Sequence, residues 1–332
     1  MKRLAHLVPA LILMAVPALA QDAAPVAAPQ APVFRSGASL VALNVTVQDK
    51  DGSRYVNGLQ PADFAVYEDG VKQDVRFFQS TAVPVDLIVL LDTSASMGDK
   101  MDIVHEAATG FLKTLREGDR GAVVAFSETV NVLQELTSDR ESLAKAIQST
   151  HAHGGTALNN AIYISLKQFG KAARQDGDVR RQAIAVLSDG EDTASLVSFD
   201  DVLVLARRMG VNIYTVALQS RYSARRIAAE GGRRYFSESD YAMTTLARET
   251  GAQSFFPLQP VELKAVYSTI ASELASQYSI GYVPANPRSD GRFRRVVVQV
   301  VSHPDLKPRT RVGYTADQDA TAGGSYPSLN HQ

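Results

Sequence analysis

Four nearly unbroken apolar runs constrain the fold of this chain more than any other feature of its sequence. The clearest covers residues 85–91 and reads Val-Asp-Leu-Ile-Val-Leu-Leu, which is typical of a strand buried on both faces of a parallel sheet. The other runs cover residues 121–126, 183–187 and 211–218, and apolar residues recur at helical spacing between them. Strands that alternate with amphipathic helices predict an α/β fold, a doubly wound, Rossmann-like, mostly parallel sheet with helices on both faces.

Alternating patterns flank this region on both sides. Between residues 40 and 79, apolar residues such as Val41, Leu43 and Val45 alternate with small or polar ones, as in half-buried strands. After a last helical pattern at 261–277, period-two spacing returns at 278–282 and a β-rich run covers 294–301. Each flank is too short to bury a core alone. We therefore expect one small β-sandwich-like domain that is built from both flanks.

The predicted organisation has six parts. Residues 1–20 have a basic start, a short apolar middle and a small-residue end, the pattern of a signal peptide cleaved after Ala20. Their apolar run is shorter than a membrane span. We expect an exported protein, periplasmic or secreted, that is peripheral to a membrane at most. The other parts are a flexible linker (21–38), the N-terminal part of the β domain (39–82), the α/β domain (83–277), the C-terminal part of the β domain (278–315) and a disordered tail (316–332).

The composition excludes some classes of function. The formal net charge is −1, which provides no general attraction to nucleic acid or to anionic membranes. The chain has no cysteine, so a packed core rather than disulfides must stabilise it. The sequence does not determine the oligomeric state.

Oxygen-bearing side chains follow the apolar runs at three places. Asp92, Ser94 and Ser96 come directly after the first run, and their spacing puts them on one side of an extended backbone. Thr156 follows two glycines just before a helical pattern, and Asp189 comes directly after the run 183–187. In a doubly wound sheet, ligands bind at the carboxyl ends of the strands. The five side chains therefore predict a site for a hard divalent cation.

These five positions resemble the metal-ion-dependent adhesion site of the von Willebrand factor type A domain, and all five match its pattern. The resemblance covers residues 84–277. The flanks are similar to those of bacterial exported proteins that carry a related domain, in Phe64-Ala65-Val66-Tyr67-Glu68-Asp69-Gly70 and in Gly313-Tyr314. The resemblance implies an adhesion-type binding protein, not an enzyme. A carboxylate of a protein or peptide partner would complete the shell of a bound Mg²⁺, with Mn²⁺ or Ca²⁺ as alternatives.

The resemblance also implies a role for each ligand. Ser94 and Ser96 would bind the cation directly, Thr156 directly or through water, and Asp92 and Asp189 mostly through water. Each part alone has a simpler explanation as a helix cap or a turn, and the coincidence of all three favours the metal. Glu191 and Asp192, which lie nearby, are interpreted as loop or cap residues.

Two other functions stay open. The chain could be a scaffold protein of the cell envelope whose β domain is the binder and whose metal site is only structural. A metal-dependent hydrolase would need a general base, for which His151 and His153 are the candidates, but common zinc-protease, serine-hydrolase and P-loop motifs are missing. An affinity switch is also open, with the last helix, 261–277, as the expected place. A connection at 219–241 either docks an acidic partner or is a solvated loop; its arginines are Arg221, Arg225, Arg226, Arg233 and Arg234.

Overall fold

The computed structural model describes residues 40–80, 83–176, 180–189, 191–218 and 237–316. The predicted signal peptide and linker, almost all of the predicted tail and the five arginines of the 219–241 connection lie outside these residues. Within the described part of the chain, no helix has the length and apolar character needed to cross a membrane.

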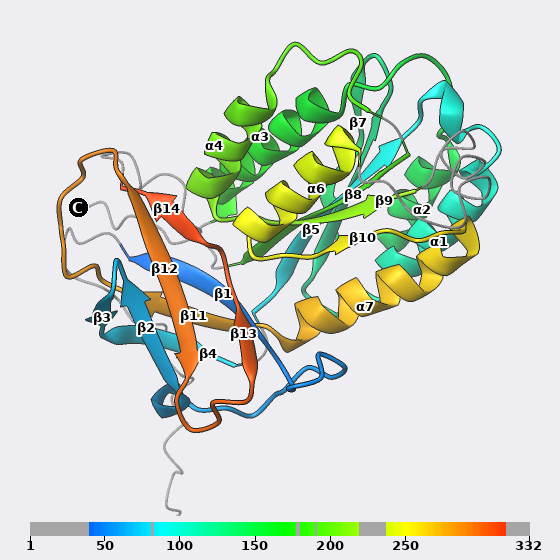
Figure 1. The fold of residues 1–332 in the computed structure, drawn as a ribbon. Coiled ribbons are helices and arrows are strands. Elements are labelled where there is room, and N and C mark those ends of the chain that lie inside the picture. The colour runs from blue at the N-terminus through cyan, green and yellow to red at the C-terminus, as the bar shows by residue number, and fades with distance from the viewer. Residues whose placement is uncertain (1–39, 81–82, 177–179, 190, 219–236, 317–332) are drawn as a thin grey trace, which may run out of the picture. The chain divides into compact units, whose positions relative to one another are not determined.

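A six-stranded sheet forms the centre of the α/β region (Figure 1). Its order is β10-β9-β8-β5-β6-β7, and β5 (Val85–Asp92) is paired in parallel with β6 (Arg120–Phe126) and β8 (Arg181–Ser188). The strand β9 (Asn212–Ala217) runs parallel to β8, and the short β10 (Ser254–Phe255) runs parallel to β9. The predicted doubly wound, mostly parallel sheet is confirmed.

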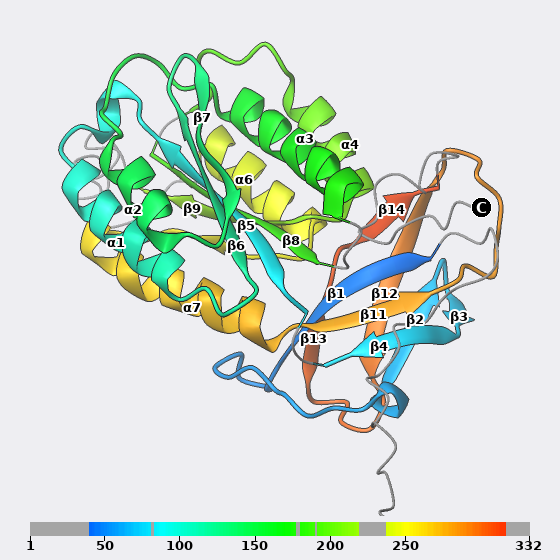
Figure 2. The same ribbon diagram turned by 180° about the vertical axis from the view of Figure 1, so that it is seen from behind.

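The edge strand β7 (Val130–Thr137), which pairs antiparallel with β6, was not predicted from the sequence (Figure 2). Its burial alternates between half-buried and exposed residues, so it lacks the continuous apolar run by which the central strands were recognised. A half-buried strand at a sheet edge needs apolar residues on one face only.

Helices cover both faces of this sheet. Successive residues of β5 point to opposite sides, and all of them are buried, so both faces of the sheet need a covering layer. Leu87, Val89 and Leu91 are buried in one core, where Phe111 and Tyr267 stack with ring centroids 4.6 Å apart. The helices of this side are α1 (Met101–Lys113), α2 (Arg140–Gln148) and α7 (Leu263–Ser276). Ile88 and Leu90 are buried in the core on the other side, with α3 (Leu158–Asp176), α4 (Phe199–Met209) and α6 (Glu238–Glu249).

Two helices are preceded by a 3-10 turn. The turn η2 (Ala95–Met97) precedes α1, which begins at Met101. The predicted helix 261–277 is divided into the turn η3 (Pro260–Glu262) and α7, because Pro260 favours a first turn. The helix α6 begins at Glu238, so residues 238–241 do not belong to the predicted connection.

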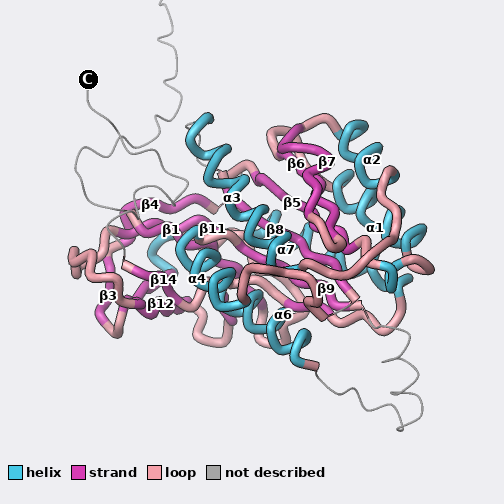
Figure 3. The backbone as a smooth tube through the Cα atoms, turned by 90° about the horizontal axis from the view of Figure 1, so that it is seen from above, coloured by secondary structure: helices cyan, strands magenta, loops and turns pink. Residues whose placement is uncertain are grey.

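The two flanks interleave in two four-stranded sheets, as predicted. One has the order β13-β1-β11-β4 and the other β14-β12-β2-β3, and their strands lie together in Figure 3. One apolar core contains residues of both sheets, among them Val45, Ile280 and Val298. The strands of the first sheet are β1 (Val41–Gln48), β4 (Val75–Gln79), β11 (Tyr278–Tyr282) and β13 (Lys307–Arg309). Those of the second are β2 (Phe64–Glu68), β3 (Val71–Gln73), β12 (Phe293–Val300) and β14 (Gly313–Thr315), with the turn η1 (Pro61–Asp63) before β2.

A buried carboxylate joins α7 to strands of both regions. Glu273 is fully buried, and its oxygens accept hydrogen bonds from Tyr214 Oη at 2.7 Å and from Tyr55 Oη at 3.1 Å. Gln253 donates a further bond at 3.1 Å, and the Arg309 guanidinium of β13 forms an ion pair with the same carboxylate. Burial, and then the charge of Glu273, raises the pKa of Tyr214 well above its usual value, so Tyr214 stays a donor.

Candidate functional site

The first predicted ligand, Asp92, is the last residue of β5 and is fully buried. Its carboxylate accepts a hydrogen bond from the Ser94 backbone N–H at 2.8 Å and one from Ser188 Oγ at 2.5 Å. Burial raises the pKa of Asp92, while these two donors act in the opposite direction. Asp92 is therefore fixed at the carboxyl edge of the sheet by the loop that follows β5 and by the last residue of β8.

The two serines and Asp189 form a continuous row of oxygens. Ser94 Oγ and Ser96 Oγ lie 3.1 Å apart, and Ser96 Oγ donates to Asp189 Oδ1 at 2.6 Å. Neighbouring oxygens around an octahedral Mg²⁺ with bonds of about 2.0–2.1 Å lie about 3 Å apart. The spacing of the two hydroxyls fits adjacent positions of such a shell. The donor set, two carboxylates and neutral hydroxyls, is the all-oxygen chemistry that a hard cation prefers.

Backbone hydrogen bonds bring the Thr156 loop to the same edge. The N–H of His153 donates to the Thr93 carbonyl at 2.7 Å, and the N–H of Ala95 donates to the Gly154 carbonyl at 3.0 Å. Gly154 has a φ of +70°, a left-handed conformation that glycine adopts without strain. Thr156 is buried just before α3, and no described side chain hydrogen-bonds its hydroxyl.

Thr193, a residue of the loop after β8, fixes the position of Thr156. Its role was not predicted from the sequence. Its hydroxyl accepts a hydrogen bond from the Thr156 N–H at 3.0 Å, and its own N–H donates to the Thr156 carbonyl at 2.9 Å. Asp192 accepts from the backbone N–H of Asn159 at 2.8 Å, at the start of α3. The interpretation of Asp192 as a cap residue is confirmed, and Glu191 is an exposed loop residue.

Lys100 is the other site residue that sequence reasoning missed. Its ammonium forms an ion pair with Asp189 Oδ2 and donates to the Ser96 carbonyl at 3.2 Å. Lys100 follows Ser96 by four residues, a spacing that puts two side chains on the same side of a helical turn. That spacing is the only signal in the sequence, and it does not distinguish Lys100 from a solvated lysine.

Of the two histidines considered as general bases, His153 has a structural role in its loop. His153 Nε2 lies 3.1 Å from Ser127 Oγ, and His153 Nδ1 lies 2.9 Å from the His151 carbonyl. With the proton on Nδ1, the ring donates to the carbonyl and accepts from Ser127. Ser127 is 1% exposed, so its hydroxyl cannot reach a substrate from solvent. The pair holds the loop before Thr156 against the end of β6.

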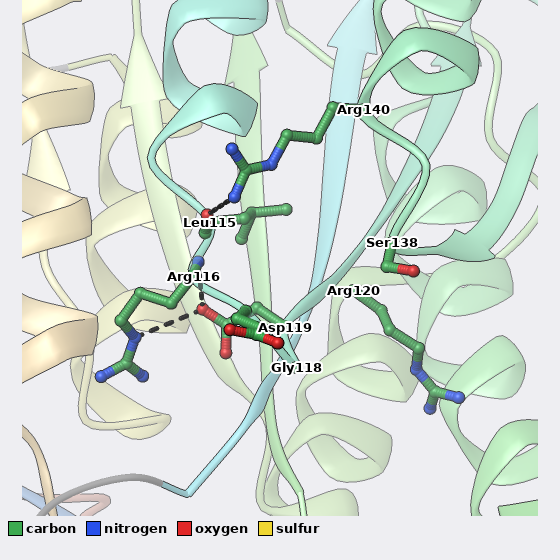
Figure 4. Close-up of a pocket in the computed structure, with 8 residues that line it drawn as sticks. Leu115, Arg116, Gly118, Asp119, Arg120, Ser138 and Arg140 are labelled. Atoms are coloured by element: carbon green, nitrogen blue, oxygen red, sulfur yellow. Dashed lines mark hydrogen bonds and ion pairs between the residues drawn. The ribbon is translucent and has the colours of Figure 1, made fainter.

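A pocket of about 430 Å³ lies at the opposite edge of the sheet, where β6 begins (Figure 4). Arg116, Arg120 and Arg140 line it, but each guanidinium already has an oxygen partner: Asp119, Asp86 and the Leu115 carbonyl, respectively. In Figure 4 the three guanidiniums point in different directions. The pocket is therefore separate from the oxygen row and does not present a convergent anion site.

Comparisons with known proteins agree with this architecture. A family model described as "von Willebrand factor type A domain" matches residues 86–249. A protein of Borreliella burgdorferi, described as uncharacterized, is 28% identical over 145 residues, which are 41% of this chain and 41% of that protein. A UPF0353 protein of Mycobacterium bovis is 27% identical over 233 residues, 66% of each chain. The chain thus spans less than two thirds of the length of either relative.

Among solved structures, a von Willebrand factor type A protein from Catenulispora acidiphila is similar at 14% identity. The similarity covers 86% of this chain and 77% of that chain, with a TM-score of 0.46. The family assignment rests on the sequence match, and the central sheet with helices on both faces is consistent with it. Over residues 86–249, this chain belongs to the von Willebrand factor type A domain family.

Proposed function

We propose that this chain is an exported, metal-dependent binding protein of the adhesion type. Domains of this family commonly mediate protein–protein interaction, and their relatives are generally not enzymes. In the proposal, Asp92, Ser94, Ser96, Thr156 and Asp189 hold one divalent cation, and a carboxylate of a protein partner completes its shell. The observation that carries the proposal is the row Ser94–Ser96–Asp189, with oxygen separations of 3.1 Å and 2.6 Å.

The donor set explains why a partner carboxylate would bind. Mg²⁺ gives up water reluctantly and keeps several waters beside a few protein oxygens. Ser94 and Ser96 would bind directly and Thr156 directly or through water, while Asp92 and Asp189 would act mostly through water. Neutral hydroxyls leave the charge of the ion largely uncompensated. An incoming carboxylate that replaces a water then gains a strong electrostatic attraction in a partly buried place.

An exposed apolar residue, Leu196, lies in the same loop as Thr193. Leu196 is 96% exposed, yet its backbone is fixed, because its N–H donates to Asn160 Oδ1 at 3.1 Å and the N–H of Val197 donates to the same oxygen at 3.0 Å. Asn160 lies in the first turn of α3, one turn beyond Thr156. Because the backbone is already fixed there, a partner that contacts this leucine has to order only its side chain. Leu196 would favour an acidic residue flanked by apolar ones.

The metal site is tested by calorimetric titration of Mg²⁺ and of Mn²⁺ into the metal-stripped protein. We expect saturable binding at one site, and at least a tenfold loss of affinity in Ser96→Ala, because that variant removes one direct ligand without leaving an unpaired charge. Ser268→Ala, an exposed serine on α7, is the matched control and should bind as the wild type does. Binding that is equal in all three proteins would place the metal elsewhere.

Partner recognition is tested with immobilised peptides that contain Asp or Glu, each paired with its Asn or Gln counterpart. We expect capture by the acidic peptides in Mg²⁺ only, loss of capture with a chelator, and weaker capture by Leu196→Asp. The amide peptides should not bind, since they lack the charge that the cation attracts.

The scaffold alternative gives the opposite result in the same assay. If the β strands are the binder, capture survives chelation and is unchanged in Ser96→Ala. Metal-dependent turnover of ester or phosphoester substrates that requires His153 would instead support the hydrolase alternative.

A further inference from the structure

Lys100 contacts Asp189, one of the five proposed metal ligands, through a buried ion pair. The side chain of Lys100 is 6% exposed and that of Asp189 is completely buried. The ammonium contacts Asp189 Oδ2, while Ser96 Oγ contacts the other oxygen of the same carboxylate. The same ammonium donates to the Ser96 carbonyl at 3.2 Å. Lys100 therefore touches two of the five proposed ligand residues.

The charges of the site explain what this contact does. A buried carboxylate without a partner is strongly destabilising, and the site contains two buried carboxylates, Asp92 and Asp189. Hydrogen bonds from Ser94 and Ser188 satisfy Asp92. The ammonium of Lys100 is the described positive charge that balances Asp189. A divalent ion at the same carboxylate would be repelled strongly by an ammonium that stayed in place.

We propose that Lys100 is a resident counter-cation of the site, and that a divalent metal must displace its ammonium from Asp189 in order to bind. This inference rests on the proposed metal-binding function. Without metal, the ion pair with Lys100 balances the charge of Asp189 and holds the carboxylate in position. With metal, two carboxylates balance the two charges of the ion, and the ammonium moves away from Asp189. Lys100 is thus a positioning residue that weakens metal affinity and preserves the site when it is empty.

The test compares Lys100→Met with Lys113→Met. Methionine keeps most of the buried stem and removes the charge. Lys113 is an exposed lysine at the end of α1, the helix that Lys100 precedes. Each protein is measured twice, by thermal unfolding in a chelator and by calorimetric titration of Mg²⁺. In the chelator, Lys100→Met should unfold about 6–15 °C below the wild type, because Asp189 is left buried and unpaired. Its Mg²⁺ affinity should rise at least tenfold, and saturating Mg²⁺ should restore most of the lost thermal stability. Lys113→Met should match the wild type in both measurements.

Other outcomes separate this inference from the proposed function. If the wild type binds Mg²⁺ and Lys100→Met binds it equally or more weakly, the proposed competition between the Lys100 ammonium and Mg²⁺ is wrong, but the proposed metal site is supported. If only Lys100→Met binds Mg²⁺, competition is supported and metal binding by the native chain is wrong. If neither protein binds Mg²⁺, both proposals are overturned. A chelator-treated Lys100→Met that is as stable as Lys113→Met contradicts the counter-cation role, whatever the titration shows.

Discussion

Replacing Glu273 by alanine is expected to lower the free energy of unfolding by about 3–5 kcal/mol, the cost of breaking a buried ion pair on one side. The carboxylate is fully buried and is shared by Tyr214, Tyr55, Gln253 and Arg309, which come from separate parts of the chain. Removing it leaves the Arg309 guanidinium without its counter-charge. It also leaves the buried Tyr214 hydroxyl without its acceptor, which adds a desolvation penalty.

Denaturant unfolding measures this loss of stability, and two further variants serve as comparisons. Glu106→Ala makes the same substitution at an exposed position of α1 and should change stability by less than about 0.5 kcal/mol. Glu273→Gln keeps an acceptor oxygen but not the charge, so its loss should lie between those of the two alanine variants. A Glu273→Ala protein as stable as Glu106→Ala would show that the buried cluster contributes little to the fold.

Gly251→Ala is expected to destabilise the protein by about 2–4 kcal/mol, through strain and overpacking together. Gly251 follows α6 with a φ of +79°, a conformation that alanine adopts only at a cost. A methyl group there would lie 2.5 Å from the Arg311 backbone nitrogen and 2.6 Å from the Thr310 carbonyl carbon. Both neighbours are backbone atoms, so no side-chain rotation can relieve the clash.

The matched control for this prediction is Gly52→Ala. Gly52 has a similar φ of +73°, but no atom lies within 4 Å of the position of an added methyl group. The Gly52→Ala substitution should lower stability only by the cost of placing alanine in a left-handed conformation, about 1 kcal/mol. Thermal unfolding of both variants separates the two contributions. Equal losses would mean that residues 310–311 move aside at Gly251 without cost.

The central sheet was predictable because a strand between two helical layers must be apolar on both sides. All residues of β5 are buried, and alternate residues enter opposite cores. Asp86, the exception within this apolar run, is 1% exposed and paired with Arg120 and Arg180. Nothing in the local sequence identifies those partners, because Arg120 begins β6 and Arg180 immediately precedes β8.

Part of the candidate site was equally predictable. The spacing of Asp92, Ser94 and Ser96 follows from the period of an extended chain, and Asp189 follows from the end of a neighbouring parallel strand. Lys100 and Thr193 were not predictable. Their roles depend on which loops meet above the sheet, and a lysine or threonine in a loop is usually solvated.

By itself, the amino-acid sequence determined the strand and helix periodicities, the pairing of the two β flanks and the residues at the carboxyl edge of the sheet. These properties depend on the spacing of apolar residues and on the need to bury apolar faces. Both can be recognised in short segments of the sequence. Only the tertiary structure decided which charged side chains contact one another.

In the sequence, Glu273 is an ordinary acidic residue of a helix, and Lys100 is an ordinary lysine before a helix. Burial removes the water that would otherwise solvate these charges, so each needs an oppositely charged or hydrogen-bonding partner. Here those partners are distant in the chain. The identity of each partner is set by the packing of whole elements.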